Sequence, residues 1–361
     1  MELPVIFAVV ITVTANAAHH GVELRDALRA PGFVQIKTGI LQHRQPFAAA
    51  IGTCDRFNAT VLQGRCQCSA ARVAKDEQVE TDVGIEHQTI RYHCGNLCQE
   101  KEAMLIVLSP AKTLDYTSTV TTDAQTRPAF MKHAAQLIEI LRERSPAQVA
   151  SLMKISDPLA QLNVQRYHDW SSRISRKNSR QAVLAFNGDV YDGLQAGSMT
   201  QPQLDYLQVH VRILSGLYGV LRPLDMMQPY RLEMGTRLAN AAGTDLYTFW
   251  GDTVTEALQA ALAPHRDKTI VNLASQEYFR SVRPLLLRGK VVTPVFEDWK
   301  GGEFKVISFF AKRARGAMAR FAALHGVKKA VQLQGFDTDG YAFDAQASDA
   351  ATWRFRRQIA D

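Results

Sequence analysis

The sequence predicts a mixed α/β (α+β) fold, with a single large domain over residues 104–361 that follows an N-terminal extension of residues 1–103. Three observations support this prediction. After residue 104, short apolar runs alternate with amphipathic segments, which is the pattern of strands and helices mixed along one chain. The chain is 46% hydrophobic and has no internal repeat, which excludes a mostly disordered or fibrous protein. All five cysteines precede residue 104, so the two parts differ in composition.

The charge of the chain divides at the same place. Residues 1–103 hold 10 basic and 11 acidic side chains, whereas residues 104–361 hold 32 and 24. The net charge of +7 therefore comes entirely from the second part. A basic excess gathered in one folded part indicates an acidic partner such as nucleic acid.

The first residues of the extension look in part like a secretory signal. Residues 4–17 are mostly apolar, but Glu2 precedes them and no Lys or Arg does, whereas such signals begin positively charged. The apolar run is also shorter than the ~18 residues that a transmembrane helix needs. We expect residues 1–103 to be a poorly organised extension or a misassigned start, with Met104 as the first residue of the functional protein.

The extension also holds a group of potential metal ligands. Zinc sites usually space paired cysteines as C-x₂₋₄-C, which only one of the two close pairs satisfies, and five is an odd number for a disulfide set. We therefore expect neither a metal site nor a disulfide framework there. The residues concerned are Cys66, Cys68, His93, Cys94 and Cys98.

The domain opens with a predicted strand over Leu105–Leu108, a fully apolar run that Ser109 and Pro110 end. A helix follows over Ala129–Arg144, because apolar side chains recur there at helical spacing. Two short helices come next. Ser145 and Pro146 begin the first, since serine caps a helix N-terminus and proline at the first helical position loses no hydrogen bond.

A tight turn joins these two short helices. The first runs through Ile155, and Ser156-Asp157-Pro158 begin the second, which ends near Trp170. Two helices so closely connected form a compact helical hairpin, which is like a helix-hairpin-helix element.

The remaining elements follow from short apolar runs and from amphipathic spacing. The predicted strands are Ala182–Phe186, Arg212–Ser215, Thr269–Leu273, Val291–Phe296 and Phe304–Phe310. The predicted helices are Gln203–Val211, Leu246–Leu262 and Ala311–Leu324. Gly301 and Gly302 join the last two strands, and Gly326 ends the last helix.

Several distinctive segments occur in order along this domain. The first is MLIVLSPAKTLDY at residues 104–116. The others are RYHDW at 166–170, AFNGDVY at 185–191, LSGLYGVLRPLD at 214–225, MQPYRLEMG at 227–235, NLAS at 272–275 and ISFFAKRARG at 307–316. Together they resemble the YaaA family of bacterial peroxide stress proteins. The resemblance covers about residues 104–356 and none of residues 1–103.

The resemblance implies a cytoplasmic protein that is induced under peroxide stress and lowers unincorporated iron in the cell. It also implies DNA binding through a basic cleft and a helix-hairpin-helix element. We expect no cofactor. We expect the DNA to be recognised by structure rather than by sequence. Residues 104–361 contain no cysteine, which excludes a cysteine-based peroxidase or redox sensor in this part.

One predicted helix presents four basic residues that favour the DNA hypothesis. They fall within an arc of roughly 160° at 3.6 residues per turn, with Gly316 near the middle, where a phosphate backbone could approach closely. The alternative is an ordinary solvated basic face. The four are Lys312, Arg313, Arg315 and Arg320.

The helical hairpin is the second candidate DNA contact. Its turn, Ile155–Pro158, lacks the glycines that usually let backbone N–H groups approach a phosphate, so Lys154 and Arg166 have to supply the attraction. The alternative is a pair of helices that pack in the core.

Lys112 leaves the first strand in a Ser-Pro-Ala-Lys turn, where a rigid scaffold holds an exposed loop. With Ser109, Arg222, Tyr230 and Arg231 it could form an anion site, and the alternative is a set of structural ion pairs.

The same residues support a rival hypothesis, an enzyme that acts on a phosphorylated small molecule. Lys112, Arg222 and Arg231 would hold the anion, and Asp189 or Glu233 would do the acid–base work. No catalytic residue is assigned, because no carboxylates cluster at a recognisable spacing. A third interpretation is direct metal binding, but the five histidines of residues 104–361 are scattered and match no ligand spacing.

Overall fold

The computed structural model describes residues 9–12, 37–40, 59–62, 65–68 and 104–358. The chain forms two compact units, residues 1–99 and 100–361. In the first unit, strand β1 (Val9–Thr12) pairs antiparallel with β2 (Lys37–Ile40), and β3 (Ala59–Leu62) pairs antiparallel with β4 (Arg65–Cys68). The possible ligands His93, Cys94 and Cys98 lie outside the described residues, so the prediction about them stays a prediction.

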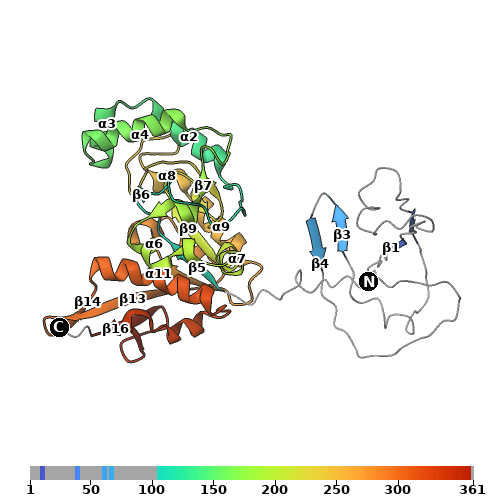
Figure 1. The fold of residues 1–361 in the computed structure, drawn as a ribbon, viewed down its shortest axis with the longest axis vertical. Coiled ribbons are helices and arrows are strands. Elements are labelled where there is room, and N and C mark those ends of the chain that lie inside the picture. The colour runs from blue at the N-terminus through green and yellow to red at the C-terminus, as the bar shows by residue number, and fades with distance from the viewer. Residues whose placement is uncertain (1–8, 13–36, 41–58, 63–64, 69–103, 359–361) are drawn as a thin grey trace. The chain divides into compact units, whose positions relative to one another are not determined.

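One mixed sheet forms the centre of the second unit (Figure 1). Within residues 104–358 it has eight strands: seven follow the order β10-β9-β5-β12-β13-β16-β15, and β14 pairs with β13. Their bounds are β5 Leu105–Leu108, β9 Val211–Ser215, β10 Gly219–Leu221, β12 Thr269–Leu273, β13 Lys290–Lys300, β14 Glu303–Lys305, β15 Ala342–Asp344 and β16 Thr352–Arg357. Strands β9, β5, β12, β13 and β16, which are neighbours in this order, run parallel. The pairs β10–β9, β15–β16 and β13–β14 are antiparallel. The mixed α/β fold is thus confirmed.

Helices surround this sheet. Their bounds are α2 Met131–Arg142, α3 Pro146–Met153, α4 Asp157–Asp169, α5 Ala182–Ala185, α6 Asp189–Leu194, α7 Gln201–His210, α8 Leu246–Trp250, α9 Thr253–Leu262, α10 Gln276–Phe279 and α11 Ser308–Leu324. Two small strand pairs lie beside the sheet: β6 (Thr113–Leu114) with β8 (Phe186–Asn187), and β7 (Arg180–Gln181) with β11 (Met226–Met227). β5 and β12 are buried over their whole length, as expected of strands covered on both faces.

The predicted pair of short helices is present. Ser145 caps α3 in a capping box with Gln148, and Pro146 takes the first helical position. Lys154 ends α3 in the left-handed conformation, at φ 52°, and α4 follows and packs on α3. Figure 1 shows α2, α3 and α4 grouped at one end of the unit.

Helices α11 and α6 pack in direct backbone contact, because each has a glycine where the two helices cross. A Cβ atom at Gly316 would lie 1.7 Å from the carbonyl oxygen of Val190, and one at Gly193 would lie 2.0 Å from that of Arg313. The expectation that a phosphate backbone approaches Gly316 is therefore wrong, since α6 occupies this space.

Three predicted elements differ from the structure. Ala182–Phe186 forms the short helix α5 and then enters β8, because a short, fully apolar run has no periodicity that separates strand from helix. The helix over Leu246–Leu262 is broken into α8 and α9 at Gly251, whose φ is +48°. The strand over Phe304–Phe310 ends at Lys305, and α11 begins at Ser308.

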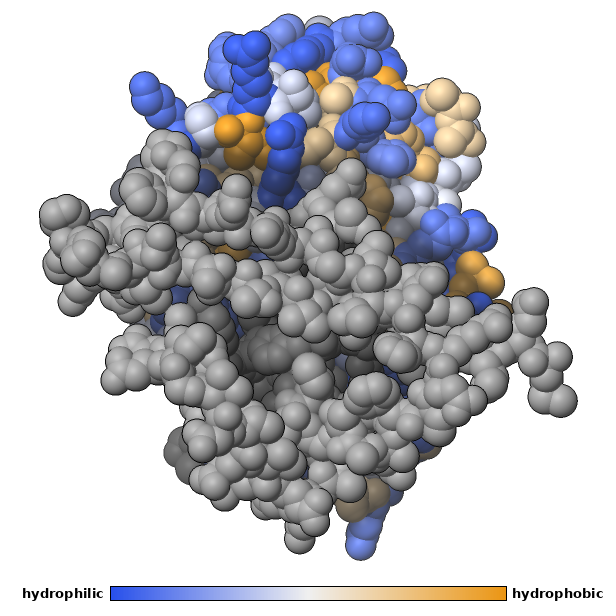
Figure 2. Space-filling model, turned by 90° about the vertical axis from the view of Figure 1, so that its right-hand side faces the viewer, coloured by the Kyte–Doolittle hydropathy of each residue, from blue (hydrophilic) through white to orange (hydrophobic). Residues whose placement is uncertain are grey.

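The surface at the α2–α4 end is mostly hydrophilic with separate apolar spots (Figure 2). Among the exposed apolar side chains of α4 are Leu159 and Leu162. In the described part of the chain, no helix has both the length and the apolar character needed to cross a bilayer.

Candidate functional site

The strand order places a topological switch point at the carboxyl ends of β5 and β12. The chain leaves β5 toward β9 on one side, and it leaves β12 toward β13 on the other. In open parallel sheets, ligands bind outside the carboxyl ends of two such strands, at the topological switch point. The register pairs Leu108 with Leu273 here, so the residues that follow these two lie close together at this edge of the sheet.

Two serines join the loops that leave β5 and β12. The backbone N–H of Ser275 donates to Oγ of Ser109 at 2.8 Å, and the two hydroxyls are 3.4 Å apart. Tyr191 donates from its hydroxyl to the carbonyl of Ser109 at 3.1 Å. Ser109, one of the predicted anion-site residues, is buried and holds the loops together.

A segment after β11 covers the carboxyl end of β9. A Cβ atom at Gly216 would lie 2.3 Å from the carbonyl oxygen of Leu232, so glycine is required for this close approach. The hydroxyls of Tyr230 and Ser215 are hydrogen-bonded at 2.6 Å. This packing brings Arg231 and Glu233 to the same edge of the sheet as Ser109.

Lys112 and Arg231 share the carboxylate of Glu233. Nζ of Lys112 lies 2.8 Å from one oxygen, and a guanidinium nitrogen of Arg231 lies 2.9 Å from the other. The side chain of Lys112 is 64% exposed, while those of Arg231 and Glu233 are only 15% and 21% exposed. The predicted grouping of Lys112 with Arg231 is therefore present, with Glu233 between them.

Two further arginines, Arg166 and Arg180, interact electrostatically with the phenol of Tyr116. Burial raises the pKa of the Tyr116 phenol far above its usual range, and the charges of Arg166 and Arg180 act on the same phenol in the opposite direction. Burial also lowers the pKa of Arg166, and the charge of Arg231 adds to this effect. We call these six residues the switch-point cluster: Lys112, Tyr116, Arg166, Arg180, Arg231 and Glu233.

The cluster has more positive than negative charge. Burial raises the pKa of Tyr116, Tyr167 and Tyr230, so these phenols are neutral at physiological pH and cannot balance the arginines. Among the described residues, Arg166 donates to the side-chain oxygen of Asn163 at 3.3 Å and Arg180 to the backbone carbonyl of Ser118 at 2.6 Å, and neither pairs with a carboxylate. The cluster therefore contains four cations and one carboxylate, which contacts Lys112 and Arg231.

Helix α4 is tied to the cluster from the hairpin side. The hydroxyl of Tyr167 donates to the backbone carbonyl of Arg231 at 2.5 Å, and Arg166 precedes Tyr167 on the helix. Arg166, predicted as a hairpin residue, and Arg231, predicted as an anion-site residue, thus belong to one site. Lys154 is exposed at the turn between α3 and α4.

Arg222 does not join the predicted anion site. Leu221 of β10 pairs with Ile213 of β9, so the chain reaches Arg222 at the amino end of β9, the opposite edge of the sheet from Lys112. There Arg222 binds the buried carboxylate of Asp225 at 2.9 Å and donates to the backbone carbonyl of Arg127 at 3.1 Å. The antiparallel turn into β10 separates Arg222 from Arg231, although the two are close in sequence.

Three of the four basic residues of α11 interact with other groups of the fold. Lys312 lies 3.4 Å from Asp189, and Arg313 lies 3.6 Å from Asp339. Arg320 donates to the carbonyls of Leu194 and Gln195 and to Oγ of Ser198, at 3.0 to 3.2 Å, which satisfies the C-terminal end of α6. Burial lowers the pKa of Arg315.

Sequence reasoning did not single out two members of the cluster, Tyr116 and Arg180. Arg180 pairs in β7 with Met227 of β11, and the hydroxyl of Tyr116 donates to the carbonyl of that same Met227 at 2.7 Å. The position of Tyr116 at the end of the SPAKTLDY segment is a signal that could have pointed to it. Arg180 follows a polar stretch with no distinctive spacing, so only the strand pairing reveals it.

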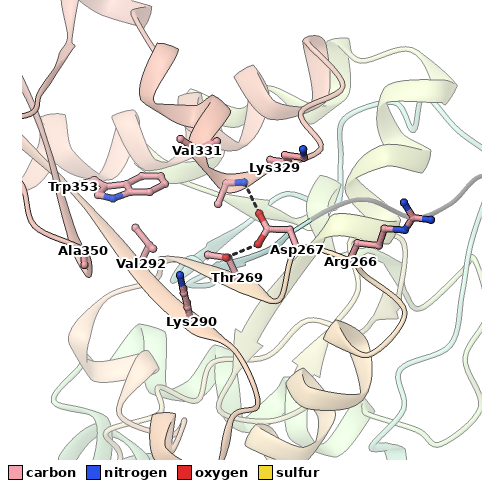
Figure 3. Close-up of a pocket in the computed structure, with 10 residues that line it drawn as sticks. Arg266, Asp267, Thr269, Lys290, Val292, Lys329, Val331, Ala350 and Trp353 are labelled. Carbon is pink, nitrogen blue, oxygen red and sulfur yellow. Dashed lines mark hydrogen bonds between the residues drawn. The ribbon is translucent and has the colours of Figure 1, made fainter.

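A cavity of about 610 Å³ opens at the other edge of the sheet, beside the amino ends of β12 and β13 (Figure 3). Val292, Val331 and Trp353 form its apolar wall. The carboxylate of Asp267 accepts hydrogen bonds from Oγ1 of Thr269 at 2.5 Å and from the backbone N–H of Ala330 at 2.8 Å. No sequence pattern predicted this cavity, and it contains none of the candidate residues.

Metal-ligating side chains do not gather in the part of the chain that the structure describes: no three His, Cys, Asp or Glu side chains there are placed to hold an ion. Three carboxylates of this part of the chain are engaged in separate ion pairs. Asp225 pairs with Arg222, Glu233 with Lys112 and Arg231, and Asp189 with Lys312.

Comparison with known proteins identifies the family. Residues 104–347 match a family model described as "Peroxide stress protein YaaA". A UPF0246 protein of Janthinobacterium sp. (strain Marseille) is 63% identical over 256 residues, which are 71% of this chain and 99% of that protein. UPF0246 proteins of Ralstonia nicotianae and Cupriavidus metallidurans are each 60% identical, over 71% and 72% of this chain and all of theirs. The resemblance predicted from the sequence segments is confirmed, and the chain belongs to the YaaA family of peroxide stress proteins.

Proposed function

We propose that this peroxide stress protein binds DNA through the cations around its switch point and its helical hairpin. The observation behind this proposal is that Lys112 and Arg231, from the strand ends, share the carboxylate of Glu233, while Arg166, from the hairpin, lies close enough to Arg231 for their charges to interact. Exposed cations that outnumber nearby acids attract the phosphate backbone without reading base sequence.

Exposure decides which of the basic residues can contact a duplex. Lys154 is exposed at the hairpin turn, and the side chains of Lys112 and Lys312 are 64% and 51% exposed. Lys312 lies near the Lys112 loop, because its partner Asp189 follows Gly188, whose Cβ position is 3.5 Å from the side chain of Ala111. These three lysines are the proposed duplex contacts, together with Arg166.

Other basic residues predicted as DNA contacts are occupied within the fold. Arg222 binds Asp225 and Arg320 satisfies the end of α6, so neither side chain is available without breaking these interactions. Arg313 lies beside Asp339, and Arg315 is half-buried. We therefore propose a smaller contact set than the sequence alone suggests.

The cellular part of the proposal is that the protein lowers unincorporated iron and so limits peroxide damage to DNA in the cytoplasm. Its support is membership of the YaaA family. Electron paramagnetic resonance of chelatable iron in whole cells tests it. Cells that lack the protein should hold more chelatable iron after peroxide exposure than cells that carry it, and equal amounts would contradict this part.

Fluorescence anisotropy with a blunt, hydroxyl-ended duplex tests the DNA part, using the full chain at several salt concentrations. We expect log affinity to fall with log salt by ~0.9 for each phosphate neutralised. Lys112→Gln, Lys154→Gln and Lys312→Gln should each weaken all duplex sequences about equally and reduce this slope.

A matched control is Arg283→Gln, which removes a cation paired with the half-exposed Asp252 outside the proposed contact set. This variant should leave duplex affinity unchanged. An affinity that does not respond to salt, or equal effects of the control and the three lysine variants, would contradict the proposed surface.

A further inference from the structure

Part of the positive charge of the switch-point cluster is on side chains that are too buried for a DNA duplex to contact. Arg180 is 6% exposed, and the side chain of Arg231 is 15% exposed. A duplex is a wide rod and touches exposed groups first. The buried arginines therefore fit a different ligand, one whose negative charge lies on a small terminal group.

Two guanidinium nitrogens in this cluster are unsatisfied. Nε of Arg180 and Nε of Arg231 are shielded from solvent, and neither has a hydrogen-bond partner among the described residues. Buried donors are nearly always paired in folded proteins, so an unpaired one at a topological switch point indicates a missing acceptor. Both nitrogens belong to cations, for which anionic oxygens are the preferred acceptors.

The surrounding groups favour the same class of ligand. The neighbouring phenols are neutral because burial raises their pKa values, so they do not compete with an incoming anion for the arginines. Glu233 neutralises only one of the four cations. A phosphate diester has one negative charge, whereas a terminal phosphate has close to two at neutral pH, which matches the remaining charge better.

We propose that the switch-point cluster binds a terminal phosphate group, that is, a phosphomonoester. Arg166 and Arg231 hold its oxygens from two sides, and Lys112 closes the exposed side. Arg180, which pairs in β7 with the same Met227 that Tyr116 hydrogen-bonds, adds positive charge on the buried side. The group belongs either to a small phosphorylated molecule or to the phosphorylated end of a DNA strand. The proposal shares Lys112 and Arg166 with the proposed duplex surface, but it rests on Arg180 and Arg231, which are too buried for a duplex to reach.

Isothermal titration calorimetry of the full chain tests this proposal with adenosine 5′-monophosphate and adenosine as the first pair of probes. We expect the monophosphate to bind and adenosine not to bind. Arg231→Gln and Arg166→Gln should each weaken monophosphate binding by about tenfold or more, because a charge-assisted hydrogen bond is lost. Lys112→Gln is the third variant, since its exposed side chain can be changed without disturbing folding.

The control is again Arg283→Gln, with thermal unfolding of every variant measured beside it. Lowering the pH from 7.5 to 5 should weaken binding of the monophosphate, because its second proton binds with a pKa of about 6. Equal binding of adenosine and its monophosphate, or unchanged affinity in all three cluster variants, would overturn the proposal.

A second pair of probes distinguishes the two sources of the phosphate. A short single strand with a 5′-phosphate that binds more tightly than both its hydroxyl-ended form and adenosine 5′-monophosphate identifies a DNA end. Equal binding of the monophosphate and the phosphorylated strand identifies a small phosphorylated ligand. Both results support the shared chemistry. If the protein binds adenosine 5′-monophosphate but does not bind the hydroxyl-ended duplex, this result contradicts the proposed DNA-binding function and leaves the phosphate site supported.

Discussion

The hydroxyl of Tyr167 donates a hydrogen bond of 2.5 Å to the backbone carbonyl of Arg231. Tyr167 lies on α4 of the helical hairpin, and Arg231 lies in the segment that covers the strand ends. The two regions are 64 residues apart in the chain, and this bond fixes one against the other. It places Arg166, the neighbour of Tyr167, beside Arg231, and it thereby unites two groups of cations that look separate in the sequence.

Tyr167→Phe tests this connection. The substitution keeps the ring in its buried position but leaves the carbonyl of Arg231 without its donor, which should lower the free energy of unfolding by about 1–3 kcal/mol. Urea denaturation measures this change. Phosphate affinity should fall in the folded variant as well, because Arg231 is held less firmly. Unchanged stability and affinity would show that α4 is fixed by other contacts.

Gly316→Ala tests the crossing of α11 and α6. The new methyl group would lie 1.7 Å from the carbonyl oxygen of Val190, so the two helices must separate, and we expect a loss of about 1–3 kcal/mol or more in unfolding free energy. Gly197→Ala is the matched control, because no atom lies within 4 Å of the added methyl group. Thermal unfolding of both variants should show a clear loss for the first only. Equal stability would mean that the crossing tolerates a side chain.

Arg320→Gln tests whether Arg320 stabilises the fold or contacts DNA. Its guanidinium donates to the carbonyls at the end of α6, so the variant should lose about 1–2 kcal/mol of stability while the folded protein binds duplex as tightly as before. Denaturation and anisotropy measure the two effects. A normal stability with weakened duplex binding would instead support the contact predicted from the helical arc.

Asp115 gives a stability change with a defined pH dependence. Hydrogen bonds from the side chain and backbone of Ser118, and from the backbone of Thr117, lower the pKa of this carboxyl below its ordinary value. Its contribution is therefore present above an unfolded pKa of about 3.9 and is lost as the pH falls toward the folded value.

Asp115→Asn should thus be less stable than the natural chain at pH 7, and the difference should shrink as the pH falls below 4. Urea denaturation at both pH values measures it. A difference that is independent of pH would contradict the assigned hydrogen bonds, since the stabilisation would then not come from the charged form of Asp115.

Elements with strong local signals were predictable, and elements defined by tertiary contacts were not. Serine and proline predicted the start of α3, and a fully apolar run predicted β5. The short helix α5 has the same kind of apolar run, Ala182–Ala185, and no local feature distinguishes it from a strand. The break between α8 and α9 depends on the positive φ of Gly251, which a single glycine in a helical pattern does not reveal.

The site follows the same division. Lys112 and Arg231 could be grouped from distinctive turn segments, and the structure places them on one carboxylate. The predicted anion site also includes Arg222, but the turn into β10 places this residue at the opposite edge of the sheet. Arg180 reaches the site only because β7 pairs with β11, a contact between distant segments that no local pattern predicts.

The most direct test of the switch-point cluster compares two substitutions that change its charge in opposite directions. Glu233→Gln removes the single carboxylate while its amide oxygen can still accept from Arg231, whereas Lys112→Gln removes a cation. In calorimetric titrations with adenosine 5′-monophosphate, Glu233→Gln should raise the affinity by about threefold or more, and Lys112→Gln should lower it. A loss of affinity in both variants, or no change in either, would contradict the conclusion that this cluster is a site for anions.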